Sequence, residues 1–167
     1  LRVAYDVHWD ACRPGQPQQL ERPVAGGPNK QRLELSADSW MLDPAFRTFW
    51  SQGEVCRGSA ASGFWPIHIE SNGTYRFGLR RWPRNADAAI SGVPKPIDRE
   101  TNVLWNAYGS SHPEYRALPI TRAKLTVAGR TIEREVAAAD KHIVFEMKLE
   151  AGEQDVRAEF FGANGKR

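Results

Sequence analysis

The sequence predicts an all-β protein, a β-sandwich of jelly-roll type, preceded by a short helix and a linker. Two observations carry this fold class. Beyond residue 30, apolar and polar residues alternate with period two in short segments separated by turn signals, which is typical of sandwiches and barrels. Helical spacing is confined to the first thirteen residues, and a proline- and glycine-rich stretch follows them. We therefore expect a terminal helix and linker over 1–30 and a β-sandwich module over 31–167.

Composition limits the function classes that remain. The chain has 167 residues, enough for one substantial core, and its 41% hydrophobic and 26% charged content is typical of a globular protein. The 23 basic and 20 acidic residues leave a net charge of +3, too small to predict a nucleic-acid partner. No apolar run approaches the roughly 18 residues needed to cross a bilayer, so we expect no membrane span.

The N-terminal segment 1–13 predicts a short helix. Residues at helical spacing share its apolar face, and Pro14-Gly15 ends the pattern. The next eighteen residues, 14–31, contain four prolines and three glycines, which predicts a linker. The helical positions are Ala4, Tyr5, His8, Trp9 and Cys12.

The first strands are expected from Leu33 and Leu35, followed by a β-hairpin over residues 63–82. Its two alternating runs flank Ser71-Asn72-Gly73, and Asn-Gly is the pair that tolerates positive φ in tight turns. A second hairpin is predicted over 120–136, turning at 128–130. A third is predicted over 143–160, turning at 151–153. Residues 83–118 are predicted to be irregular and contain several aromatic side chains.

These segments resemble the C-terminal region of secreted bacterial arylsulfatase-like enzymes. The resemblance lies in GFWPIHIESNGTYRFGLRRWP, ALPITRAKLTV and VFEMKLEAGEQDVRAEFFGANGK, with LSADSW and FWSQGEV upstream. YDVHWDACRPGQ is similar to the last helix of the sulfatase catalytic domain, whereas the insert at 91–116 departs from the family pattern. The resemblance implies a secreted or periplasmic, non-catalytic module that packs on the catalytic domain of the same polypeptide.

The residues offer little support for catalysis by this chain. Sulfatases use a formylglycine from a C/S-x-P-x-R motif, and the segment from Cys12 to Gln16 lacks the final arginine. We therefore expect Cys12 to be structural, and its bridging to Cys56 stays open. The four histidines show no zinc-ligand spacing. No cofactor is expected here, and the calcium that the resemblance implies belongs to the parent catalytic domain.

One group of aromatic and arginine residues is the candidate binding site. Arg81 shares the parity of the core-facing residues, so its charge must find partners. It either forms a salt bridge that closes the end of the sandwich or pins the insert, or it recognises a sulfate or carboxylate while Trp65 or Trp82 stacks on a sugar. The alternative functions are an independent binding module for a sulfated or other polysaccharide and a small hydrolase or lyase. The candidates are Trp65, Arg80, Arg81, Trp82, Trp105 and Tyr108.

Overall fold

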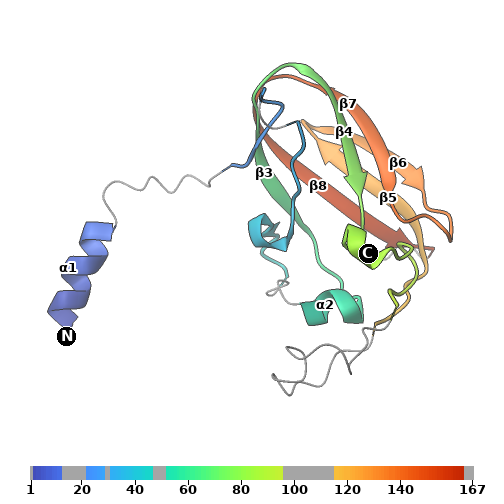
Figure 1. Ribbon diagram of the computed structural model, residues 1–167, viewed down its shortest axis with the longest axis horizontal. Helices are drawn as coiled ribbons and strands as arrows, with labels where there is room; N and C mark the ends of the chain where they lie inside the picture. Colours follow the sequence, from blue (N-terminus) through green and yellow to red (C-terminus); the bar gives the residue numbers. More distant parts are fainter. Residues whose placement is uncertain (1, 13–21, 29–30, 47–51, 96–114, 164–167) are drawn as a thin grey trace.

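The computed structural model describes residues 2–12, 22–28, 31–46, 52–95 and 115–163. Within these ranges the protein is mostly β, with eight strands in two sheets and a short N-terminal helix (Figure 1). The strands are β1 (Val24–Ala25), β2 (Met41–Leu42), β3 (Gly63–Ile69), β4 (Gly73–Leu79), β5 (Ile120–Val127), β6 (Arg130–Glu135), β7 (Ile143–Leu149) and β8 (Gly152–Gly162). The helices are α1 (Arg2–Cys12) and α2 (Gln52–Arg57), with 3₁₀ turns η1 (Ala37–Ser39) and η2 (Arg84–Ala86).

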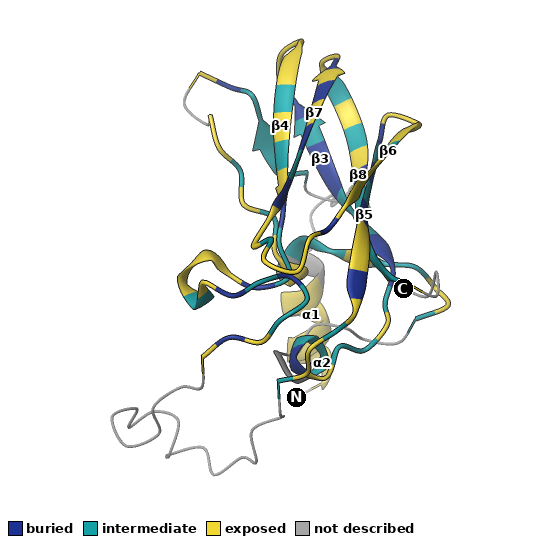
Figure 2. Cartoon of the chain, turned by 90° about the vertical axis from the view of Figure 1, so that its right-hand side faces the viewer, coloured by how far each residue is buried: buried dark blue, intermediate teal, exposed yellow. Residues whose placement is uncertain are grey.

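The two sheets differ in size but share one hydrophobic core. The larger sheet has the order β1-β3-β8-β5-β6, with β2 also pairing with β3, and the smaller sheet is β4-β7. Along β7 and the second half of β5 every second residue is buried, so these strands turn alternate side chains toward the core (Figure 2). Fully buried side chains come from both sheets and include Ile67, Ile69, Leu125, Val127 and Phe145.

The predicted hairpins over 63–82 and 143–160 are wrong, although their strands are present. β3 pairs with β8 and β4 pairs with β7, all antiparallel, so the chain crosses between sheets after β3 and again after β7. Asn72 and Gly73 do not have positive φ, as a tight hairpin turn would require. Instead, Asn72 Oδ1 accepts a hydrogen bond of 2.7 Å from Ala151 N, which ties the two crossings together.

The hairpin predicted over 120–136 is confirmed as β5-β6. Val127 pairs with Arg130, and the two residues between them, Ala128 and Gly129, have φ of 51° and 70°. Two positive φ values in succession are the mark of the type I′ turn, whose twist matches that of the strands. The N-terminal helix is confirmed as α1.

The strand predicted at Leu33 and Leu35 is wrong, because residues 32–36 have no regular secondary structure. Both leucines nevertheless pack against the core. The segment contacts elements on either side: Trp65 Nε1 of β3 donates to Ser36 O at 2.6 Å, and Arg84 of η2 lies 3.4 Å from Glu34. The alternation therefore predicted correctly that these two leucines pack against the core, although the segment that carries them is irregular and not a strand.

Two glycine substitutions should distinguish the β5-β6 turn from the crossing between β3 and β4, because only the turn requires a positive φ. Gly129→Ala places a β-carbon on a residue with φ +70°, and we expect the free energy of unfolding to fall by about 1 kcal/mol. Gly73→Ala meets only Tyr75 at 3.7 Å and needs no strained φ, so we expect a change within about 0.5 kcal/mol. Urea unfolding of both variants measures the difference. The opposite order would contradict this turn assignment.

Candidate functional site

Arg81 follows β4 and gathers the backbone carbonyls of three separate segments. Its guanidinium donates to Val55 O at 3.3 Å, Ile90 O at 3.5 Å, Gly92 O at 3.3 Å and Arg116 O at 2.7 Å. Burial lowers the pKa of Arg81 to about 10, because the cation has lost part of its hydration. Among the described residues its acceptors are carbonyls, so the side chain pins both ends of the insert without a salt bridge.

Trp82 is buried beside Arg81, with 5% of its surface exposed. Its Nε1 donates to Gly92 O at 3.2 Å, and Tyr115 packs edge-on against its ring at 5.6 Å. The Arg81 guanidinium lies 4.3 Å from the ring centroid, within cation–π range. Internal contacts thus occupy the ring, and a sugar could stack on it only after these contacts move.

The remaining predicted site residues lie apart from this pair or outside the described ranges. Trp65 is partly buried and stacks on Trp40, with ring centroids 5.5 Å apart. Arg80 places a guanidinium nitrogen 3.3 Å from His142 Nδ1. Trp105 and Tyr108 lie outside the described residues. The structure therefore brings together Arg81 and Trp82, and it gives Trp65 a separate packing role.

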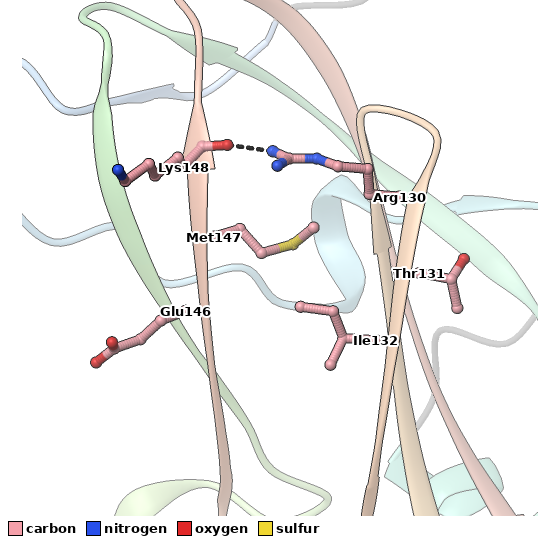
Figure 3. Close-up of a pocket in the computed structure, with 6 residues that line it drawn as sticks. All are labelled: Arg130, Thr131, Ile132, Glu146, Met147 and Lys148. Carbon is pink, nitrogen blue, oxygen red and sulfur yellow. Dashed lines mark hydrogen bonds between the residues drawn. The ribbon is translucent and has the colours of Figure 1, made fainter.

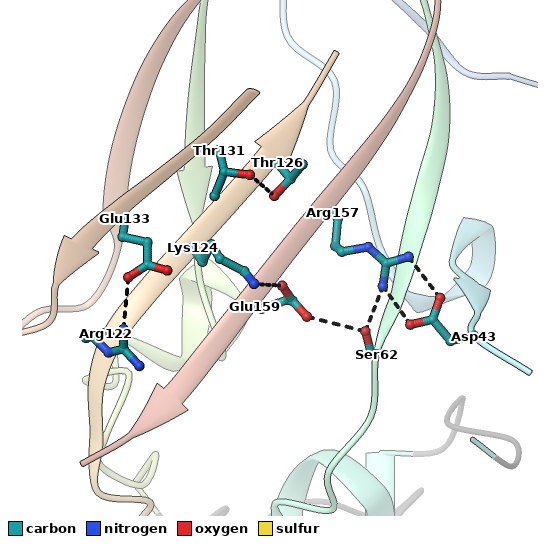
Figure 4. A network of polar contacts seen from close by, with 9 residues as sticks. All are labelled: Asp43, Ser62, Arg122, Lys124, Thr126, Thr131, Glu133, Arg157 and Glu159. Atoms are coloured by element: carbon teal, nitrogen blue, oxygen red, sulfur yellow. Dashed lines mark hydrogen bonds and ion pairs between the residues drawn. The ribbon is translucent and has the colours of Figure 1, made fainter. Parts of the chain in front are cut away.

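A chain of polar contacts on the larger sheet was not predicted from the sequence (Figure 4). Arg157 forms a two-pronged ion pair with Asp43 at 2.6 and 2.9 Å and also donates to Ser62 Oγ at 2.7 Å. Ser62 Oγ donates in turn to Glu159 at 3.4 Å, and Lys124 lies 2.8 Å from the same carboxylate. Hydrogen bonding to Asp43 raises the pKa of Arg157.

This polar network balances its charges, and its centre is closed to substrates. Two carboxylates, Asp43 and Glu159, face two cations, Arg157 and Lys124, so the buried charge of Glu159 is paired with a partly exposed lysine. A serine beside a carboxylate can resemble a nucleophile with its base, but Ser62 is only 1% exposed. The network joins the segment after β2 and the start of β3 to β5 and β8, which is a structural role.

A groove of about 480 Å³ lies between β6 and β7 (Figure 3). Ile132 and Met147 face one another across it, and the Arg130 guanidinium donates to the carbonyl of Lys148. None of the predicted binding residues lines it. Its lining residues are Arg130, Thr131, Ile132, Glu146, Met147 and Lys148.

The described residues give no indication of a metal centre. They contain no group of three or more His, Cys, Asp or Glu side chains placed to hold an ion. Cys56 is a free, buried thiol whose pKa is raised by burial, while the side chain of Cys12 lies outside the described set. No described helix is long and apolar enough to cross a membrane.

Comparisons of the chain with protein-family models, with curated proteins and with solved structures gave no match. The sulfatase resemblance therefore stays a prediction.

Removing the Arg81 guanidinium should destabilise the fold. We expect Arg81→Met to lower the free energy of unfolding by about 2 kcal/mol, because four carbonyls lose a donor while the apolar stem is kept. The neighbouring Arg80→Met should change it by less than about 0.5 kcal/mol. Urea unfolding followed by tryptophan fluorescence measures both. Equal effects of the two substitutions would contradict a specific role for Arg81.

Proposed function

We propose that this chain is the non-catalytic C-terminal module of a secreted or periplasmic sulfatase-like hydrolase. The β-rich part serves as a jelly-roll sandwich, and α1 packs into the catalytic domain of the same polypeptide. The observation that carries the proposal is the apolar surface of α1. Val3, Tyr5 and Val7 are 75%, 60% and 64% exposed, although valine is among the residue types most often buried (Figure 2).

The sequence of α1 supports its burial in another domain. Arg2 and Asp6 lie four positions apart and share one narrow stripe of the helix. Apolar residues, with His8 among them, cover about two thirds of the circumference. A helix that is apolar over so wide an arc belongs inside a protein. An isolated helix of eleven residues is also marginal in water, so α1 needs a surface to pack against.

The internal contacts of the β-rich part favour packing over catalysis. Ser62 and Glu159 are buried within the polar network, and Arg81 with Trp82 is engaged by the insert. In this proposal the formylglycine and calcium chemistry of the parent enzyme belongs to the catalytic domain. The module contributes a surface that packs on the catalytic domain. A supporting role in carbohydrate recognition would belong to residues of the module that lie beside that domain.

The packing of α1 can be tested in the full-length gene product. We expect the pair Val3→Asp and Val7→Asp to lower the melting temperature by at least about 5 °C, because two charges would enter an apolar contact. Asp6→Lys, on the polar stripe, should leave the melting temperature within about 1 °C and serves as the matched control. Differential scanning calorimetry measures these changes.

Activity assays supply the other half of the test. The chain alone should not hydrolyse an aryl sulfate ester, whereas the full-length product should. Turnover by the chain alone, or a gene product with no catalytic domain before this module, would overturn the proposal.

An independent carbohydrate-binding module is the alternative function. With Trp82 enclosed and Trp65 stacked on Trp40, this alternative would depend on Trp105 and Tyr108, which lie outside the described residues. Affinity electrophoresis through dextran sulfate and through neutral dextran decides between the two. We expect no retention beyond that of a lysozyme-sized basic control. Retention that disappears in Trp105→Ala would favour the alternative.

A further inference from the structure

We propose that the groove between β6 and β7 binds an extended peptide segment by strand addition. The preferred segment carries an apolar residue flanked, two positions away on each side, by acidic residues. The inference stands on the β-rich part alone and does not depend on the parent enzyme.

Within the part of the chain that the structure describes, two strand edges without a partner strand face this groove. β6 ends the larger sheet, and β7 pairs only with β4 among the described residues. The two-residue turn makes Val127 and Arg130 a hydrogen-bonded pair, so the backbone groups of alternate residues in β6 point away from β5. These outward residues are Thr131, Glu133 and Glu135. On β7 the Lys148 carbonyl points into the groove, because it accepts a hydrogen bond from Arg130.

The separation of the two edges suits one additional strand. Arg130 extends from β6 to the backbone of β7 (Figure 3). An arginine side chain and one hydrogen bond together span up to about 10 Å. Neighbouring strands lie about 4.8 Å apart, so this reach allows a gap of up to about two spacings, which is the width that a single added strand needs. An inserted strand would take over the Lys148 carbonyl that Arg130 now occupies.

The inward side chains of the groove set the preferred sequence. Ile132 and Met147 provide an apolar floor, and Arg130 and Arg134 flank Ile132 on the same face of β6. The Arg134 guanidinium lies 5.7 Å from the ring of the buried Phe145, which confirms that it turns inward. On an added strand, residues two apart would lie beside these three β6 side chains.

Strand insertion would bury both guanidinium groups, and a buried charge needs a partner. Carboxylates beside Arg130 and Arg134, with an apolar side chain beside Ile132, satisfy that requirement. The same charges disfavour a second copy of the chain. An antiparallel copy of β6 centred on Ile132 would set Arg130 against Arg134, and opposed like charges on a sheet are destabilising.

The methionines make a direct test available. The chain has two, Met147 in the groove and Met41 on β2, a strand that pairs with β3 on the other side of the larger sheet. The full chain is labelled with methyl-¹³C methionine, and Met41→Leu assigns the two signals. The probe is a nonapeptide of threonine with glutamate at its third and seventh positions and valine at its fifth.

We expect the Met147 methyl signal to shift saturably with this peptide while the Met41 signal stays in place. A peptide with lysine in place of both glutamates should bind at least about tenfold more weakly. This comparison needs no protein variant. If neither signal moves at millimolar peptide, if both move alike, or if the lysine peptide binds equally well, the proposal is overturned.

Charge reversal provides the second arm. The double variant Arg130→Glu and Arg134→Glu should prefer the lysine peptide by at least about tenfold. Arg122→Glu is the matched control, because Arg122 pairs with Glu133 at 2.9 Å on the opposite face of the hairpin. It should keep the wild-type preference. An unchanged preference in a double variant that melts cooperatively would contradict the assignment of these arginines.

Discussion

The fold depends on two coupled crossings between its sheets. β3 pairs with β8 and β4 with β7, so the two chain segments that change sheet do so side by side. The Asn72 side chain joins them through the Ala151 amide. At each crossing the chain passes from one sheet to the other, and the apolar faces of the two connected strands then face one another. The core is therefore enclosed between the sheets. Among the described residues the crossings leave two strands in the smaller sheet, while the larger continues to β5 and β6. The groove beside β7 follows from this mismatch.

The contacts of Arg81 hold the fold together at the C-terminal end of β4, as the crossings do at its N-terminal end. A carbonyl in a loop needs a donor when water is excluded, and Arg81 supplies donors to four carbonyls at once. Arginine suits this position better than lysine, because its planar group carries five donors in fixed directions. The lowered pKa of Arg81 reflects the desolvation that this arrangement costs. One side chain thereby connects α2, both ends of the insert and the sandwich.

Period-two alternation predicted which residues of the long strands are buried, but it carries no information about which strand pairs with which. The turn at Ala128-Gly129 was predictable because its conformation is local. Asn72-Gly73 presents the same local signal, yet the contact with Ala151, far away in sequence, determines its conformation. The parity of Arg81 predicted burial and the need for partners. Its carbonyl acceptors belong to α2 and to the two ends of the insert, and their approach to Arg81 depends on the tertiary fold. The sequence therefore could not identify them, nor the polar network around Ser62.

The two sides of the core that the sheets leave open are covered by different kinds of contact. This difference favours the binding of an added strand at the groove. On the side of β3 and β4, Leu33 and Leu35 pack against the core, and removing them would expose apolar surface. On the side of β6 and β7, the exposed Arg130 spans the gap with a single hydrogen bond. A hydrogen bond that competes with water contributes only about 1 kcal/mol. An added strand would replace that bond with several backbone bonds and would cover the partly exposed Ile132. Displacement of the arginine from the β7 edge is therefore favourable where the incoming strand brings carboxylates to pair with it.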